Sequence, residues 1–189
     1  MPSSPKIPKE LILDEALKIL IRDGYEAVNI KALAKEIGCS TQPISWHFGN
    51  MEGLRKSLSE YAQNYAINKL FDIQDNGVES FFNLGLNYLD IAFDEPKLFV
   101  FLFMNGGSGY TANNLSVFSD LGQNAVITEQ LAQQLNISQE LAGAYVQDLT
   151  VYTHGLASYI ATGVLSISRE EARETLMRAG TCFFDKYNF

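Results

Sequence analysis

Apolar residues recur every three or four positions along most of the chain, a spacing that predicts amphipathic helices. The first apolar stripe lies in residues 9–23 and ends at Gly24. The second lies in residues 30–37, with Asn29 in the N-cap position before it and Gly38 in a capping position after it. A helix this short is unstable alone, so we expect its apolar stripe to pack against neighbouring helices.

A third short helix follows the glycine turn. Ser40 or Thr41 can cap it, and Pro43 falls in its first turn, where a missing backbone N–H costs little. Its buried face is expected to hold Ile44 and Phe48. The side chains left on its outer face are Thr41, Gln42, Ser45, Trp46 and His47. Two short helices joined by a glycine turn, the second with a polar face, are typical of the helix-turn-helix that reads a DNA major groove.

These residues resemble the DNA-binding domain of TetR/AcrR-type transcriptional regulators. The family pattern has an apolar-Ala pair in the second helix, Gly-Val-Ser at the turn, an apolar-Tyr-x-His-Phe recognition helix and Asn-Lys-x-x-Leu at the start of the fourth helix. With the same spacing, this chain has Leu33-Ala34, Gly38-Cys39-Ser40, Ile44-Ser45-Trp46-His47-Phe48 and Asn50-Met51-Glu52-Gly53-Leu54. Two positions depart from the pattern: Ser45 replaces the family's Tyr and Met51 replaces its Lys, and both family residues typically contact the DNA backbone.

The resemblance implies an all-α fold with a three-helix DNA-binding head and a roughly six-helix body for ligand binding and dimerisation. We place the head at residues 1–50 and the body at residues 51–189. The fourth helix is expected at about residues 51–71, and it would lead from the head into the body.

The candidate DNA-contact residues lie on the recognition helix and at the helix starts beside it: Lys31, Ser40, Thr41, Gln42, Pro43, Ser45, Trp46, His47, Asn50, Met51 and Lys56. Gln42 stands where side chains reach base edges, and Gln suits adenine. Two alternatives stay open. Trp46 and His47 can instead pack the head, and Lys31 and Lys56 can be solvated charges rather than phosphate contacts.

Further helices are expected at residues 78–94, 97–104, 115–135, 138–163 and from Ser168 onward. Pro96 sets the boundary before residues 97–104, which are apolar nearly all round and should be buried. Ser138 can cap the helix that follows it, and Ser168 opens a capping box that Glu171 completes. The glycine-rich residues 105–109 are expected to be the most flexible stretch.

Phe and Tyr are abundant between residues 71 and 159, and together with the glycine-rich loop they favour an apolar ligand pocket with few polar anchors. The candidate ligand-binding residues are Phe71, Phe81, Tyr88, Phe99, Phe103, Tyr145, Tyr152 and His154. An ordinary aromatic core is the alternative for each of them.

Members of the resembled family dimerise by pairing their last two long helices into a four-helix bundle. The resemblance therefore implies a dimer interface on the last two helices of this chain. The candidate interface residues are Tyr159, Leu176, Ala179, Cys182 and Phe183.

The chain is acidic as a whole but not at its start. It has 14 basic and 22 acidic residues, a formal net charge of −8. Residues 1–56 hold eight of the basic and seven of the acidic residues, which leaves −9 for the rest. A head near neutrality on an acidic body suits a small DNA contact and a body that repels phosphate.

Catalytic chemistry has little support in the sequence. The two histidines, His47 and His154, stand far apart, and no catalytic Ser, Cys or carboxylate pair, metal cluster or phosphate-binding glycine loop is recognisable. Cys39 and Cys182 form no CxxC pair and suit small apolar residues of a reduced cytosolic protein. We expect no signal peptide, no membrane span, no catalytic residue, no metal and no cofactor, and a cytoplasmic location.

The sequence thus predicts a ligand-responsive transcriptional regulator, mainly a repressor, that binds a palindromic operator on double-stranded DNA as a homodimer. Its effector is expected to be an apolar or aromatic small molecule. The alternative is a helical ligand-binding or interaction module that has lost strong DNA binding, which Ser45, Met51 and the net charge of −8 favour. An enzyme is a distant third.

Overall fold

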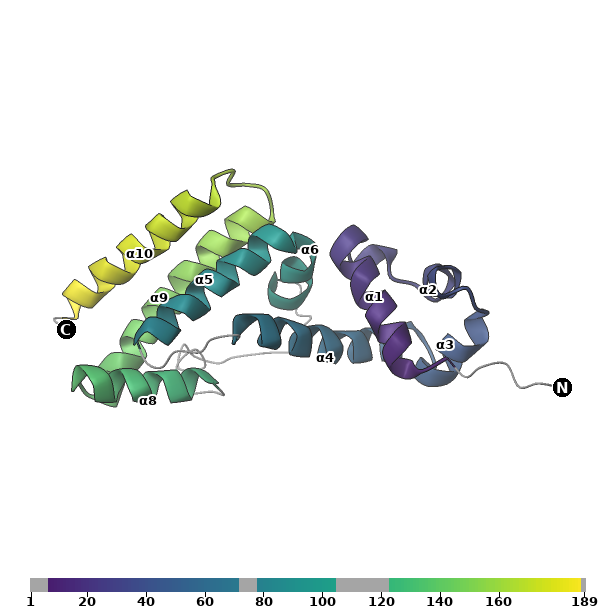
Figure 1. Cartoon of the computed structure of the whole chain (residues 1–189), viewed down its shortest axis with the longest axis horizontal. Coiled ribbons are helices and arrows are strands. Elements are labelled where there is room, and N and C mark those ends of the chain that lie inside the picture. The colour runs from purple at the N-terminus through teal and green to yellow at the C-terminus, as the bar shows by residue number, and fades with distance from the viewer. Residues whose placement is uncertain (1–6, 72–77, 105–122, 188–189) are drawn as a thin grey trace. The chain divides into compact units, whose positions relative to one another are not determined.

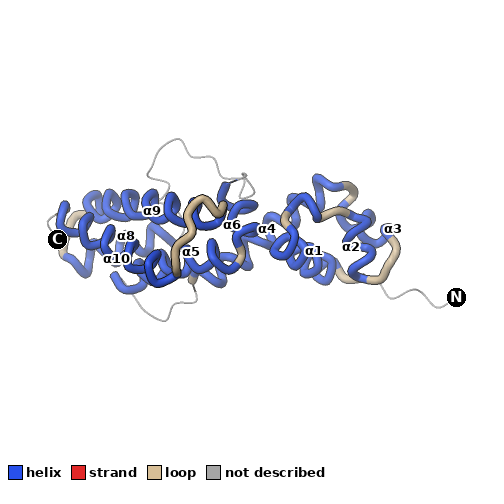
Figure 2. The backbone as a smooth tube through the Cα atoms, turned by 90° about the horizontal axis from the view of Figure 1, so that it is seen from above, coloured by secondary structure: helices blue, strands red, loops and turns tan. Residues whose placement is uncertain are grey.

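The computed structural model describes residues 7–71, 78–104 and 123–187, and every regular element in these ranges is helical (Figure 1, Figure 2). The expected all-α fold is confirmed. The loop expected at residues 105–109 and the start of the helix expected at 115–135 lie outside the described residues. Contacts divide the chain into two compact units: unit 1 is Met1–Ile67 with Glu95–Gly109, and unit 2 is Asn68–Asp94 with Tyr110–Phe189.

Unit 1 contains the expected three-helix head. α1 (Lys9–Asp23), α2 (Ile30–Ile37) and α3 (Thr41–Phe48) pack on one another, and the short 3-10 helix η1 (Tyr25–Ala27) connects α1 to α2. α4 (Met51–Leu70) follows and contributes a row of buried residues at every fourth position. The core of the head is formed by fully buried side chains from all four helices: Ile12, Ala16, Leu20, Leu33, Ile44, Leu54 and Leu58.

The chain returns to unit 1 after α5, as α6 (Pro96–Phe99) and the π-helical turn η2 (Val100–Met104). Leu98, Phe99, Phe101 and Leu102 are buried, as expected for a segment that is apolar nearly all round. The single helix expected at residues 97–104 instead changes its hydrogen-bond register at Val100.

α6 packs on α1 of the head. Lys97 Nζ donates to the main-chain oxygen of Arg22 at 2.7 Å, in the last turn of α1. The Tyr25 ring stacks on Phe101, with centroids 5.1 Å apart. Tyr65 Oη donates to Glu95 Oε1 at 2.7 Å, so α4 is also connected to the start of this segment. Residues far along the sequence therefore complete the unit that holds the helix-turn-helix.

Unit 2 consists of α5 (Val78–Asp94), α8 (Gln123–Leu135), α9 (Gln139–Ala161) and α10 (Arg169–Lys186) in the described residues. α5, α9 and α10 pack against one another, and α8 packs on α5 and α9 (Figure 1). Tyr145 is fully buried, and its hydroxyl donates to the main-chain oxygen of Gly180 at 3.3 Å. Burial raises the pKa of Tyr145 to about 12, so this phenol stays protonated near neutral pH.

The expected boundary after residue 50 does not coincide with the division of contacts, because most of α4 and the α6–η2 segment group with the head. The contacts divide the chain by packing, whereas the expected boundary divides it by function. The functional boundary stays a prediction.

Candidate nucleic-acid interface

The turn between α2 and α3 has the geometry that its sequence suggests. Asn29 Oδ1 accepts from the Ala32 amide at 2.9 Å and caps α2. Gly38 ends the helix with φ 73°, a left-handed conformation that a side chain disfavours. The Cys39 amide then donates to the Ala34 carbonyl at 2.9 Å, which satisfies one of the last carbonyls of α2.

α3 begins at Thr41, and its N-cap residue Ser40 makes no side-chain capping bond. An N-cap oxygen accepts from the amide two or three residues after it, and the third residue here is Pro43, which has no N–H. Ser40 is exposed. Its hydroxyl is therefore not committed to the cap, although the sequence places it where a cap is expected.

One face of α3 is buried and the other is exposed. Ile44 and Phe48 are buried in the head. Trp46 is 72% exposed, so its indole is not part of the core of the head. The exposed polar residues around it are Ser40, Thr41, Gln42 and Ser45, while Pro43 and His47 are half-buried. α3 thus presents a polar surface with one large aromatic side chain.

His47 makes a contact that its place in the motif does not suggest. Its Nε2 lies 2.8 Å from the main-chain oxygen of Ile7, just before α1. The next residue, Phe48, has the Lys9 ammonium 5.6 Å from its ring centroid. The end of the recognition helix is therefore connected to the start of α1 by two neighbouring contacts.

α4 starts directly beside the end of α3. Asn50 Oδ1 accepts from the Gly53 amide at 2.9 Å and caps the helix. A Cβ at Gly53 would lie 2.1 Å from the Phe48 carbonyl oxygen, so only glycine permits this approach. Asn50, Met51 and Lys56 are exposed. The guanidinium of Arg55 lies over the Tyr25 ring, 4.7 Å from its centroid, and adds a contact to η1.

The candidate cations at the edges of this surface are Lys31, at the start of α2, and Lys56, in the second turn of α4. Both are exposed, and no carboxylate in the described ranges pairs with either one. The chemistry of the surface is thus exposed hydroxyls, an amide, an indole and two cations. These groups can donate to phosphates and to base edges.

Comparison with known proteins bears directly on this segment. Residues 12–58 match the model of a family described as bacterial regulatory proteins, tetR family. The head is a tetR-family domain. The match extends from α1 into α4 and includes both positions, Ser45 and Met51, at which the chain departs from the usual pattern.

The tetR-family head is part of a chain whose fold also has a counterpart among solved structures. A protein described as a TetR-family transcriptional regulator from Rhodococcus sp. is similar at a TM-score of 0.61, over 91% of this chain and 96% of that chain. The sequence identity is 14%, so this likeness shows the fold alone. None of the curated proteins matches the chain by sequence.

The candidate ligand-binding residues are divided between the two units. Phe99 and Phe103 belong to unit 1, with ring centroids 5.1 Å apart. The others belong to unit 2, where Phe81 and Tyr145 are buried, Phe71, Tyr88 and His154 are half-buried and Tyr152 is exposed. The sequence grouped these residues by type, and the structure does not bring them together in one unit.

Tyr88 and His154 form the most polar part of this set. Tyr88 Oη lies 2.9 Å from His154 Nδ1, and Ser158 Oγ lies 3.4 Å from Nε2. Burial raises the pKa of Tyr88 and lowers the pKa of His154. The phenol therefore keeps its proton and can donate to a neutral imidazole.

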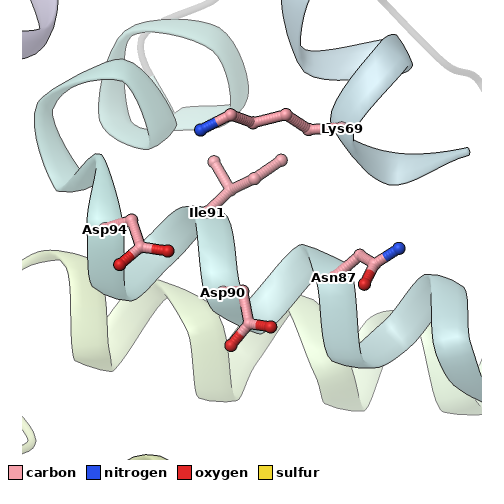
Figure 3. Close-up of a pocket in the computed structure, with 5 residues that line it drawn as sticks. All are labelled: Lys69, Asn87, Asp90, Ile91 and Asp94. Atoms are coloured by element: carbon pink, nitrogen blue, oxygen red, sulfur yellow. The ribbon is translucent and has the colours of Figure 1, made fainter. Parts of the chain in front are cut away.

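A polar pocket of about 190 Å³ lies on unit 2, lined by Lys69, Asn87, Asp90, Ile91 and Asp94 (Figure 3). Its acidic groups are engaged by α10. Arg169 and Arg173 donate to the two oxygens of Asp90, each at 2.7 Å, and Arg169 also donates to Asp94 at 2.5 Å. None of the candidate ligand-binding residues lines this pocket, and its polar lining differs from the apolar pocket that the aromatic residues favoured.

The candidate dimer residues differ in their exposure. Tyr159 is 57% exposed on α9, and Cys182 is exposed on α10. Ala179 and Phe183 are half-buried. Leu176 is only 1% exposed and lies in the core of unit 2, because the inner face of α10 turns it toward α5. Leu176 is therefore not available to an interface on this surface.

Residues that were not candidate DNA contacts also support the interface, namely Ile7, Lys9, Gly53 and Arg55. The sequence holds a partial signal for Gly53, since a glycine inside a helical stripe costs stability relative to alanine and a close packing contact can explain it. Ile7 contributes its main-chain oxygen to the bond with His47. Every residue has this group, so the residue type gives no signal for the contact. Among the described helices, none has the length and apolar character needed to cross a membrane.

Proposed function

We propose that this chain is a ligand-responsive transcriptional regulator, mainly a repressor, that binds a palindromic operator as a homodimer and has no enzymatic activity. The observation that carries the proposal is the tetR-family helix-turn-helix whose α3 has an outer face of exposed polar residues and Trp46. The N-terminal residues of a recognition helix contact base edges, so Thr41 and Gln42 are the proposed base-reading residues. A regulator of this kind acts in the cytoplasm, with the DNA.

Phosphate contacts are proposed for the residues around that face. Lys31 and Lys56 supply cations, and Ser40, Ser45, Trp46 and Asn50 supply N–H or O–H donors. Pro43 and Met51 can contribute only apolar contact. Because Met51 replaces a lysine, the start of α4 supplies one charged side chain fewer for phosphate contact than the family pattern provides.

The dimer is proposed to form through α9 and α10, by way of Tyr159, Ala179, Cys182 and Phe183. In support, α9 has exposed apolar side chains at Val151, Tyr152 and Tyr159. A two-fold dimer would place its heads in successive major grooves, about 34 Å apart. An effector bound in unit 2 would act by favouring a separation of the heads that no longer fits the operator.

A gel-shift experiment with the DNA directly upstream of the chain's own gene tests the proposal. We expect a complex that resists competition by unrelated DNA at moderate salt. If no specific complex forms there, the regulator proposal loses its main support. The neighbouring genes would then indicate which small molecules to test as effectors.

The alternative is a helical ligand-binding or interaction module with little remaining DNA affinity. It is favoured by Ser45 and Met51, which lack the side chains that usually contact the DNA backbone, and by the net charge of −8. The double variant Ser45→Tyr with Met51→Lys separates the two candidates. Operator binding that appears only in the double variant supports the alternative, and binding by the natural chain supports the regulator.

A further inference from the structure

The recognition helix and the start of α1 are held together by contacts that the helix-turn-helix pattern does not require. The acceptor for His47 is a carbonyl oxygen, 2.8 Å from Nε2, so Nε2 must carry the hydrogen of this bond. In a neutral imidazole the other nitrogen, Nδ1, then has no hydrogen to donate. A neutral His47 in this bond therefore cannot also donate to a DNA phosphate.

The start of α1 has little stabilisation of its own. Its N-cap residue is Pro8, which makes no side-chain capping bond, and the first bond of the helix, from the Ile12 amide to the Pro8 oxygen, is long at 3.4 Å. Helix ends without caps fray unless other contacts hold them. Here the His47 bond to Ile7 supplies such a contact from outside the helix.

Lys9 is the first residue of α1 and lies near the contact between His47 and Ile7 in the sequence. Its ammonium lies 5.6 Å from the centroid of the Phe48 ring, at the end of the recognition helix. Lys9 is exposed, and no carboxylate in the part of the chain that the structure describes pairs with it. Met51, where the family pattern has its lysine, begins α4 only three residues after Phe48.

We propose that His47 is a positioning residue for DNA binding: by holding Ile7, it places Lys9 beside the end of the recognition helix, where Lys9 contacts a DNA phosphate. The inference rests on the proposed DNA-binding function. It makes His47 a positioning residue instead of a DNA contact. Lys9 on α1 supplies the positive charge that Met51 lacks. The His47 imidazole bonds to the main chain of Ile7 and not to DNA.

The test uses the full-length chain and a DNA duplex that the wild-type chain selects from a random pool. Dissociation constants are measured by fluorescence anisotropy over a series of salt concentrations for Lys9→Gln, His47→Ala, His47→Gln and the double variant Lys9→Gln/His47→Ala. Lys18→Gln is the matched control, because it removes the same charge from α1 where Lys18 pairs with Glu15 at 2.7 Å. Circular dichroism establishes that each variant keeps its helical content.

We expect Lys9→Gln to weaken binding about three- to tenfold and to reduce the salt slope by about one phosphate contact. His47→Ala should have the same effect, and the double variant should bind no more weakly than either single variant. His47→Gln should bind like the wild type, because the glutamine Nε2 can donate to the same carbonyl. Lys18→Gln should leave the slope unchanged.

Two results overturn the inference while leaving DNA binding intact. One is a Lys9→Gln variant with the wild-type salt slope, which would exclude the phosphate contact. The other is an effect of His47 that does not depend on its bond to Ile7 or on Lys9, seen as His47→Gln binding as weakly as His47→Ala or as additive losses in the double variant. If His47→Ala does not fold, Lys9→Gln and His47→Gln still decide. A wild-type chain that selects no duplex overturns the proposed function itself, and with it the role of Lys9.

Discussion

At the residue scale, Gly53 allows the start of α4 to lie close to the end of the recognition helix. We expect Gly53→Ala to lower the free energy of unfolding by about 1–3 kcal/mol, the range for forcing an extra group into a packed site. The reason is the Phe48 carbonyl oxygen, 2.1 Å from where the new Cβ would lie, which would push the start of α4 away from α3. Chemical denaturation followed by circular dichroism measures the change.

Gly155→Ala in α9 is the matched control, because a Cβ there meets nothing within 4 Å. A glycine-to-alanine change inside an unhindered helix should stabilise by about 0.5–1 kcal/mol. Equal effects of the two substitutions would contradict the close approach at Gly53.

His154 should make the stability of the chain depend on pH. Burial lowers the pKa of His154 in the folded state, so as the pH falls the unfolded chain takes up this proton first. The free energy of unfolding should therefore decrease as the pH drops below about 6.5, the ordinary histidine value, and continue to decrease down to the folded pKa. Denaturation at a series of pH values measures this dependence.

His154→Asn should remove that part of the pH dependence, since an asparagine oxygen can replace Nδ1 as the acceptor for Tyr88 without titrating. The His47→Gln variant keeps His154 and should keep the dependence. A pH profile that is the same with and without His154 would contradict the assignment.

Most of the helix caps were predicted from the sequence. Ser138 and Ser168 were predicted as N-caps, and each accepts from the amide three residues on, at 3.1 Å. Asn29 and Asn50 behave in the same way. Ser40 makes no such bond, and Pro43 removes one of the two amides that could donate to it. These outcomes depend on residues within one turn of each other, which the sequence contains in full.

At the scale of elements, Lys97 connects α6 to the end of α1 by a hydrogen bond to the Arg22 main-chain oxygen. Lys97→Met should lower the free energy of unfolding by about 1 kcal/mol, because the Arg22 carbonyl loses a donor while the aliphatic stem of the side chain is kept. Thermal or chemical unfolding measures the loss. Lys35→Met, an exposed lysine of α2 with no ion pair in the described ranges, is the control and should change stability little.

The docking of α6 and η2 onto the head could not be predicted from the sequence, although the burial of this segment could. An apolar segment must be covered, and that much follows from composition. What covers it depends on partners more than seventy positions away, such as Arg22 for Lys97 and Tyr25 for Phe101. Helical periodicity gives the buried face of a helix and contains no information about which distant helix will pack there.

At the scale of the whole molecule, the chain crosses between its two units after Ile67, after Asp94 and after Gly109. The chain therefore connects unit 2 to the unit with the helix-turn-helix along α4 and also along the α5–α6 connection. The sequence predicted the first route, since α4 was expected to lead from the head into the body. The second route required knowing that residues 95–109 group with the head, which follows from tertiary packing.

The proposed dimer can be tested at Tyr159, on the outer face of α9. Tyr159 is 57% exposed on α9 and cannot be stabilising the isolated chain by burial to any large extent. Tyr159→Arg should therefore leave the fold unchanged but place two like charges near each other across a two-fold interface, where like-charge contacts are strongly unfavourable. Size-exclusion chromatography with light scattering should show a shift from dimer to monomer.

Loss of the dimer should also weaken operator binding, by roughly a hundredfold to ten-thousandfold, because each head would then bind its half-site alone. Val126→Arg on α8 is the matched control: Val126 is 48% exposed in the same unit but lies outside the proposed interface, so this variant should stay dimeric. If Tyr159→Arg stays dimeric while Val126→Arg dissociates, the interface lies on α8 instead. If both variants and the wild type are monomers that bind the operator equally well, the symmetric arrangement of heads is wrong, and the palindromic operator loses its basis.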